Sequence, residues 1–177
     1  MSSGDKRPLA EAIAAAEAFK ALFAGMYDRW IVAGSVRRRK PEVADIEHVI
    51  ISGRVFNEMD QMLPVEGLFP EPGVLTKAIY PNGTTRWGDK YRGVVYGGFR
   101  HEVFRATHDN FGCILTIRTG PAEFSERMVT QLRDAGNFRQ QDGYIVSQHN
   151  GERLSVPSEE EFFRLCGCQW IQPEDRR

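Results

Sequence analysis

Apolar side chains recur at steps of three and four residues in the N-terminal part of the chain, from Leu9 to Met26. This spacing places them along one face of a helix. Pro8 stands at the start of the pattern, and proline is well tolerated in the first turn of a helix because its missing N–H would have no partner there. The pattern therefore predicts an amphipathic helix over residues 8–27.

Two apolar runs follow, at residues 30–33 and 43–52, and each is typical of a short buried strand. Gly34-Ser35 ends the first run and predicts a turn. Residues 54–63 favour a short helix, and the prolines after it predict a loop. Runs of β-forming residues broken by glycine turns then predict strands at 94–96, 101–106 and 111–118.

The character of the sequence changes at Thr119-Gly120-Pro121. Residues 121–135 again have the apolar spacing of a helix. Short alternating runs joined by Asp-Gly and Asn-Gly turns predict a small antiparallel sheet after this helix. Ser158 with Glu161 three residues later forms a capping box before a last helix. The chain is therefore predicted to have an α+β fold that divides near residue 119.

Composition agrees with a soluble globular protein, since 41% of the 177 residues are hydrophobic and 27% are charged. The polar N-terminus does not fit a signal peptide, and no apolar stretch fits a membrane span. We therefore expect a cytoplasmic protein with no membrane partner. The three cysteines cannot all pair, and the further ligands of a zinc site are missing near them, so reduced thiols are expected.

The net charge is −1, which argues against a protein held on nucleic acid by its overall positive charge. The distribution is more informative, because 18 of the 23 basic residues are arginine and residues 37–40 form a basic cluster. The planar guanidinium matches phosphate oxygens better than the point charge of lysine does. A local phosphate-binding role and a solvated turn both explain this cluster.

Two carboxylates, Asp45 and Glu47, are separated by Ile46 inside an apolar run. The two-residue period of a strand places both on one face. Like charges at this spacing repel each other, and divalent cations would remove the repulsion. The pair indicates a candidate metal site, although taken alone such a pair is more often a solvated strand face.

The turn at Gly34-Ser35 lies upstream of these carboxylates. A helix or turn that begins here would offer backbone N–H groups, which bind phosphate, and Arg38 would lie on the same side. Phosphate donors, a guanidinium and two metal-binding carboxylates are the groups needed for phosphoryl transfer from a triphosphate.

The run Gly34-Ser35-Val36-Arg37-Arg38, followed by Asp45-Ile46-Glu47, resembles the nucleotidyltransferase signature of family X DNA polymerases. That signature has Gly-Ser, a paired arginine and an Asp-x-Asp pair. The segment from Glu102 to Ala106 is similar to the family's third-carboxylate strand, and Thr119-Gly120-Pro121 to its Thr-Gly turn. The tail is similar as well, so the resemblance covers nearly the whole chain. It is closest to the minimal virus- or phage-type members, which consist of a palm and a terminal subdomain.

This resemblance implies a palm with a mixed sheet and helices on one side, residues 1–118, and a thumb-like nucleotide-binding subdomain, residues 119–177. It implies a DNA polymerase that acts in gap filling or repair as a monomer, with dNTP and primer-template or gapped DNA as partners. A viral or phage member would act in the host cytoplasm.

The resemblance also assigns roles to single residues. Asp45 and Glu47 would bind two Mg²⁺ ions, and Glu102 would complete the site of the ion that activates the primer 3'-hydroxyl. Nucleotide-binding roles fall to the residues of the two glycine-containing turns and the nearby arginine: Gly34, Ser35, Arg38, Thr119 and Gly120. Two of the three carboxylates are glutamate where the family generally has aspartate, which would favour Mn²⁺ as an alternative metal.

Two other functions remain open from the sequence. One is a minimal nucleotidyltransferase that adds nucleotides without a template or to a non-DNA acceptor. The other is a noncatalytic nucleotide-binding or nucleic-acid-binding module, which the glutamates favour. His48 and His101 adjoin proposed ligands, but strand alternation turns them to the opposite face, so a supporting or surface role is expected for them rather than metal binding. Trp87 and Tyr91 are expected to serve packing.

Overall fold

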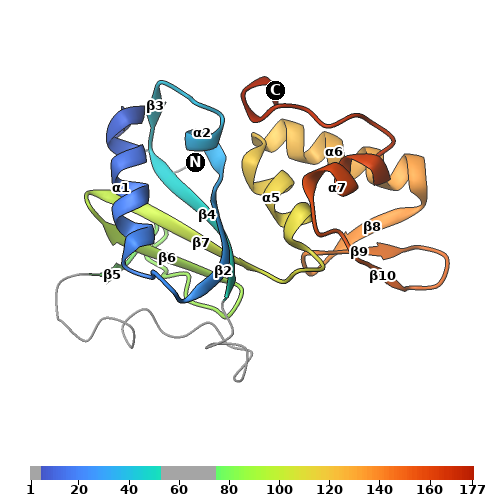
Figure 1. Cartoon of the computed structure of the whole chain (residues 1–177), viewed down its shortest axis with the longest axis horizontal. Coiled ribbons are helices and arrows are strands. Elements are labelled where there is room, and N and C mark those ends of the chain that lie inside the picture. The colour runs from blue at the N-terminus through green and yellow to red at the C-terminus, as the bar shows by residue number, and fades with distance from the viewer. Residues whose placement is uncertain (1–4, 53–74) are drawn as a thin grey trace. The chain divides into compact units, whose positions relative to one another are not determined.

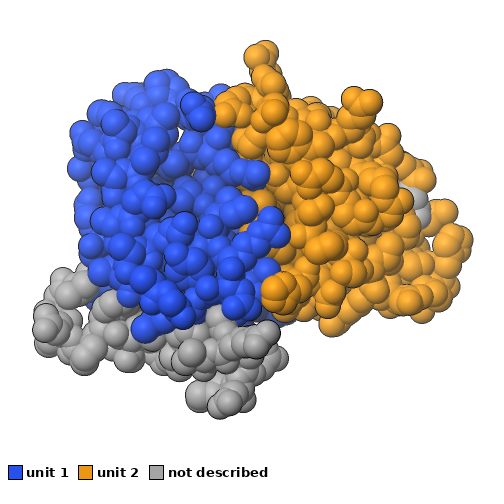
Figure 2. Space-filling model, in the orientation of Figure 1, with its two compact units in different colours: residues 1–105 blue, residues 106–177 orange. Residues whose placement is uncertain are grey.

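The computed structural model describes residues 5–52 and 75–177. The chain divides into two compact units, Met1–Arg105 and Ala106–Arg177 (Figures 1 and 2). The division falls earlier than residue 119 because helix α5 (Phe111–Thr119) packs with the helices of the second unit. Each unit has a hydrophobic core of its own.

The first unit is built on a five-stranded sheet with the strand order β2-β4-β7-β6-β5. Antiparallel pairing joins β2 to β4, β5 to β6 and β6 to β7. The strands predicted around 30–33, 43–52, 94–96 and 101–106 are confirmed as β2 (Tyr27–Val32), β4 (Asp45–Ser52), β6 (Tyr91–Tyr96) and β7 (Phe99–Ala106). The sheet also contains β5 (Thr76–Lys77), which was not among the predicted strands. A separate two-stranded ladder pairs β1 (Arg7–Pro8) with β3 (Glu42–Val43).

The predicted N-terminal helix is present as α1 (Leu9–Ala21), and it ends before residue 27. The chain turns at Gly25, whose φ of 81° suits glycine, and then enters β2. A short helix, α2 (Gly34–Arg37), follows β2 where the sequence predicted a turn. The helix predicted at residues 54–63 lies outside the described residues.

Helix α1 covers one face of the sheet of the first unit (Figure 1). Phe19 is at the centre of this contact, with its ring centroid 5.2 Å from that of His48 and 4.3 Å from that of His101. Both histidines are fully buried. The expected turn of these side chains toward the face opposite the acidic residues is therefore confirmed. The surface role that was also expected for them is wrong, because that face packs beneath α1 and forms the core.

A directed chain of hydrogen bonds satisfies the two buried imidazoles. Trp30 Nε1 donates to His48 Nδ1 at 2.9 Å, and His48 Nε2 lies 2.9 Å from His101 Nδ1. An indole N–H can only donate, so His48 carries its proton on Nε2 and donates it to His101. His101 Nε2 then donates to the carbonyl of Tyr96 at 3.2 Å. Every ring nitrogen has a partner only while both imidazoles are neutral.

Burial lowers the pKa of His48 well below its usual value, and the neighbouring His101 lowers it further. Burial also lowers the pKa of His101 to about 4, although its hydrogen bond to the Tyr96 carbonyl works in the opposite direction. An unfolded histidine takes up its proton near pH 6.5. Stability contributed by the neutral pair is therefore complete above that pH and is lost as the pH falls toward 4.

We predict that the free energy of unfolding decreases between about pH 7.5 and pH 5, with His101 alone contributing on the order of 2 kcal/mol. Urea unfolding at the two pH values measures the change. A histidine NMR titration identifies its source, with the exposed His149 resolved in the same spectrum for comparison. Titration of both buried imidazoles near pH 6.5 would contradict the prediction.

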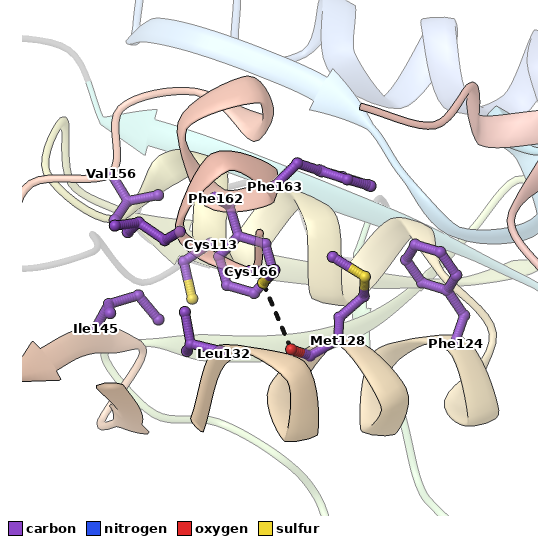
Figure 3. Packing of buried hydrophobic residues seen from close by; sticks show 10 residues of the cluster. Cys113, Phe124, Met128, Leu132, Ile145, Val156, Phe162, Phe163 and Cys166 are labelled. Atoms are coloured by element: carbon purple, nitrogen blue, oxygen red, sulfur yellow. Dashed lines mark hydrogen bonds between the residues drawn. The ribbon is translucent and has the colours of Figure 1, made fainter. Parts of the chain in front are cut away.

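The second unit combines helices with a three-stranded antiparallel sheet of order β10-β9-β8. The predicted helix at 121–135 and the small sheet after it are confirmed. The elements are α5, α6 (Ala122–Gly136), β8 (Phe138–Gln141), β9 (Tyr144–Ser147), β10 (Arg153–Leu154), α7 (Glu159–Leu165) and the 3-10 turn η1 (Pro173–Asp175). Their apolar side chains interlock in one core (Figure 3). Within it, Cys166 Sγ lies 3.5 Å from the Met128 carbonyl oxygen, and the described cysteines form no disulfide.

The strand predicted at 111–118 is wrong, because this segment is helix α5. A short apolar run gives no periodicity that separates a buried helix from a buried strand. Cys113, Leu115 and Thr116 are all buried, since α5 packs against both α6 and α7. The helix is therefore buried on more than one side. Its sequence lacks the regular polar positions of an exposed helix face, which would have indicated a helix.

The predicted cap of the last helix is confirmed in one of its two bonds. The Ser158 hydroxyl accepts the Glu161 N–H at 3.3 Å, while the Glu161 carboxylate pairs with Arg164. The C-terminal tail is held by a buried ion pair in which Arg176 Nη1 lies 2.7 Å from Glu159 Oε1. Trp170 Nε1 donates to the other oxygen of Glu159 at 3.2 Å. No helix among the described residues has the length and apolar character needed to cross a membrane.

Gly112 allows α5 to approach the start of α7. A Cβ atom at this position would lie 1.9 Å from the Ser158 carbonyl oxygen, and that oxygen belongs to the cap of α7. Backbone atoms cannot move away as a flexible side chain can. We predict that Gly112→Ala destabilises the protein by about 1–3 kcal/mol or more, the range for overpacking.

Thermal unfolding of Gly112→Ala and Gly88→Ala measures this effect. A Cβ at Gly88 would meet its nearest atom at 3.9 Å, so this variant controls for the loss of a glycine. Equal melting temperatures for the two variants would contradict the close approach at Gly112.

Candidate functional site

The period of two along β4 and β7 separates a core face from a face that carries acidic residues. On β4, Ile46 and His48 are buried beneath α1, so Asp45 and Glu47 lie on the opposite face. On β7 the same alternation places Glu102 opposite the buried His101. Since β4 and β7 are neighbours in the sheet, the three carboxylates lie on one face of adjoining strands.

Arg100 stands between two of these carboxylates. It lies two residues before Glu102 and therefore on the same face of β7. Its Nη2 donates a hydrogen bond to Asp45 Oδ2, and its Nε lies 3.0 Å from Glu102 Oε1. The side chains of Arg100 and Glu102 are only 16% and 12% exposed, so water screens this pair weakly. Burial tends to lower the pKa of Arg100, but Glu102 and Asp45 outweigh burial and raise it.

Glu47 lies against a glycine, Gly34. Gly34 begins α2 with a φ of 60°, and an added Cβ would lie 2.1 Å from Glu47 Oε2. A hydrogen bond of 2.8 Å from the Ala33 N–H to the Glu47 carbonyl fixes the two segments side by side. The glycine of the Gly-Ser turn therefore makes room for a predicted metal ligand.

The phosphate-binding residues predicted in the first unit lie on and just after α2. Ser35 is in its first turn and is partly buried, and Arg38 is its C-cap. The first N–H groups of a helix have no partner within it. The backbone of α2 closes through bonds from Arg37 to Ala33 and from Arg38 to Gly34, at 3.3 and 3.1 Å. Ser35 and Arg38 thus belong to the same tight segment as the glycine beside Glu47.

Tyr80 and Tyr91 also contact this acidic face, and the sequence did not predict that they would. Tyr80 donates to Glu102 Oε1 at 3.2 Å, and its hydroxyl oxygen lies 2.6 Å from that of Tyr91. Burial raises the pKa of both phenols, and in both cases the Glu102 charge adds to the effect. The expected packing role of Tyr91 is present too, as its ring stacks on Phe104 with centroids 4.6 Å apart.

A signal for Arg100 was present in the sequence. Arg100 lies one residue before the strand predicted at 101–106 and two residues before Glu102, so an extension of that strand by one residue would have placed both on one face. Tyr80 carried no comparable signal, because its position depends on how the chain before β6 folds back over the sheet. Trp87, expected to pack, contacts two cations, with Lys77 Nζ and Arg92 Cζ 4.6 and 4.8 Å from its ring centroid.

The donor set has the chemistry that Mg²⁺ and Mn²⁺ prefer, since carboxylate oxygens are hard ligands. The guanidinium of Arg100 is a stand-in for such a cation, because Asp45 and Glu102 share its positive charge. Within the described part of the chain, no three acidic, histidine or cysteine side chains are grouped around one point. Asp45 and Glu102 therefore fit a cation that takes the place of Arg100, and Glu47 lies on the same face of the sheet, beside Gly34.

The two remaining predicted residues lie in the second unit. Thr119 is the last residue of α5 and is buried, and Gly120 is its C-cap. An added Cβ at Gly120 would lie 2.3 Å from Phe124 Cδ1. The Thr-Gly turn therefore has a packing function in joining α5 to α6, and its contact with nucleotide stays a prediction.

Comparison with known families places the second unit. Residues 114–177 match the family model of the DNA polymerase beta thumb. This match covers α6, the small sheet, α7 and most of α5, and it supports a relation to the polymerase-beta-like family X proteins. A comparison with curated proteins finds no relative close enough in sequence to be recognised. The predicted α+β fold is confirmed, and it is consistent with a small polymerase-beta-like fold.

We predict that Gly34→Ala displaces Glu47 and destabilises the first unit. A positive φ costs an L-residue about 1–2 kcal/mol, and the contact with Glu47 adds an overpacking term of about 1–3 kcal/mol. Gly25→Ala is the matched control, because Gly25 has a φ of 81° but nothing within 4 Å of an added Cβ. Urea unfolding of both variants isolates the second term, and equal losses would mean that Glu47 does not depend on Gly34.

Proposed function

We propose that this chain is a nucleotidyltransferase of the DNA polymerase beta type, which transfers a nucleotide from a dNTP to a primer 3'-hydroxyl. The observation that supports it most directly is the sharing of one cation, Arg100, by Asp45 and Glu102. Two carboxylates on neighbouring strands that already hold a positive charge are suited to hold a divalent metal. The thumb match over residues 114–177 supports the same class independently.

In this proposal Asp45, Glu47 and Glu102 hold two Mg²⁺ or Mn²⁺ ions. When bound, such ions neutralise the phosphate charge and lower the pKa of an attacking hydroxyl. The protein itself contributes position. The strands β4 and β7 fix the spacing of Asp45 and Glu102, and the segment at Gly34 fixes Glu47.

Ser35 and Arg38 bind the β- and γ-phosphates of the nucleotide in this proposal. The support is their place on the tight segment that follows β2, where the first-turn amides of α2 point away from the helix. Arg38 adds a planar guanidinium suited to phosphate oxygens. The sequence resemblance assigns nucleotide contacts to Thr119 and Gly120 as well, and these stay part of the proposal.

We propose primer-template or gapped DNA as the second substrate and a role in gap filling or repair. The thumb match favours DNA over other acceptors, because that family model is named for a DNA polymerase. The minimal form made of palm and thumb-like subdomain, as in virus- or phage-type members, is part of this proposal, and its support is the sequence resemblance described above.

One observation favours a noncatalytic nucleotide-binding or nucleic-acid-binding module as a second candidate. Arg100 occupies the position between Asp45 and Glu102, and a permanent ion pair there would leave these carboxylates without a metal. Metal binding requires Arg100 to turn away. The free energy of replacing the Arg100 guanidinium by a divalent cation decides whether the chain is an enzyme or a binding module.

We predict that Asp45→Asn abolishes nucleotidyl transfer, by a factor of about 10³ or more, because it removes a charge that positions both metals. The assay extends a labelled primer on gapped and on single-stranded DNA, with dNTPs or NTPs and either Mg²⁺ or Mn²⁺. Glu42→Gln is the matched control, since Glu42 is an exposed carboxylate on β3 of the same unit.

Each outcome of this assay selects one function. Template-matched extension by the wild type, lost in Asp45→Asn and kept in Glu42→Gln, supports the polymerase. Untemplated addition, or transfer to another acceptor, supports a minimal nucleotidyltransferase. DNA binding without turnover supports the binding module, and full activity of Asp45→Asn removes the metal mechanism.

A further inference from the structure

Two tyrosine hydroxyl groups form a row that ends at Glu102. In the sheet, β7 with Glu102 lies between β4, which carries Asp45, and β6, which carries Tyr91. The Tyr80 hydroxyl lies 3.2 Å from Glu102 Oε1 and 2.6 Å from the hydroxyl of Tyr91. Arg86 Nη1 lies 3.4 Å from the Tyr91 oxygen. The two tyrosines therefore connect the exposed guanidinium of Arg86 to the carboxylate of Glu102 in the candidate site.

The direction of every bond in this row follows from the chemistry of the groups. An ionised carboxylate can only accept, so the single proton of the Tyr80 hydroxyl is donated to Glu102. Tyr91 must then donate to Tyr80, and Arg86, which can only donate, serves Tyr91. The row is therefore polarised toward Glu102, and each bond strengthens the next.

The position of the Tyr80 phenol depends on a residue with no side chain. Gly93 on β6 is paired with Glu102 on β7, so the two share a face of the sheet. A Cβ at Gly93 would lie 2.5 Å from the Tyr80 hydroxyl oxygen. The Tyr80 ring makes cation–π contacts with two guanidinium groups, with Arg86 Cζ and Arg100 Cζ 4.3 and 5.2 Å from its centroid. Tyr80 is only 7% exposed.

Glu102 gains from this arrangement because a glutamate has one more rotatable bond than an aspartate. A carboxylate at the end of a longer chain samples more positions, and a bound cation must select one of them. Tyr80 and Arg100 both contact Oε1. If Arg100 turns away, the bond from Tyr80 still fixes Oε1 and with it the orientation of Oε2.

We propose that Tyr80, supported by Tyr91, is a positioning residue that holds the Glu102 carboxylate in the orientation needed to share a divalent cation with Asp45. The inference rests on the proposed function and deepens it. It assigns to two tyrosines the task of compensating for the longer acidic side chain at position 102.

The test compares Tyr80→Phe, Tyr91→Phe and Tyr96→Phe in the full chain. Each removes one hydroxyl, and the structure records no hydrogen bond to the Tyr96 side chain among the described residues, so Tyr96→Phe is the control. The first readout is the dissociation constant for Mn²⁺ alone, measured by the loss of the free-ion EPR signal. The second is the division of any rate effect between kcat and KM for dNTP, with thermal unfolding as a check on the fold.

We expect Tyr80→Phe to weaken Mn²⁺ binding about 10-fold, the lower end of the usual effect for a partner of a metal ligand. We expect kcat to fall by a similar factor with KM for dNTP nearly unchanged. Tyr91→Phe should have a smaller effect in the same direction, and Tyr96→Phe none. Glu102→Gln sets the scale, and its loss of Mn²⁺ affinity should exceed that of Tyr80→Phe.

Wild-type affinity for Mn²⁺ in a folded Tyr80→Phe variant would overturn the inference, as would a wild-type chain that binds no Mn²⁺. An equal loss in Tyr96→Phe would also overturn it, since any lost hydroxyl would then suffice. If the wild type binds Mn²⁺ but transfers no nucleotide, the proposed function fails alone. The Mn²⁺ affinities of the variants then still decide the role of Tyr80.

Discussion

The alternation of side chains along β4 and β7 is the constraint on which the first unit depends. Each strand must bury one set of residues beneath α1, and the set between them is then forced onto the other face. Ile46 and His48 occupy the core side of β4, so Asp45 and Glu47 cannot. A slip of one residue in either strand would bury carboxylates and expose imidazoles. The acidic face is thus fixed by the same free energy that stabilises the core.

The polar groups on the two faces of the sheet of the first unit find their partners in different ways. On the core side, a single direction of hydrogen bonding from Trp30 through His48 and His101 satisfies neutral imidazoles without any charge. On the other side, Arg100 neutralises Asp45 and Glu102, and a row of hydroxyl groups completes the set. A buried charge without a partner is costly. On the acidic face, the guanidinium of Arg100 is that partner for Asp45 and Glu102.

Much of the fold could be predicted from the sequence because local patterns encode it. The helix at α1, the strands β4 and β7, the helix α6 and the cap at Ser158 all have signals within a few residues. The strand predicted at 111–118 was wrong because a helix buried against two others has no polar stripe. The division into units depended on that same segment, since α5 contributes its contacts to the second unit.

The sequence by itself determined which residues share a face, because the period of a strand is a property of the backbone. That was enough to place Asp45 and Glu47 opposite His48 on one strand and Glu102 opposite His101 on another, whereas the shared face of the two strands was only implied by the family resemblance. Only the tertiary structure decided which groups touch. Arg100 on β7 contacts Asp45 on the neighbouring strand β4. Tyr80 donates to Glu102 beside Gly93, and Glu47 lies against Gly34. These contacts join residues that are far apart in the chain. A local sequence pattern therefore does not predict the distances between them.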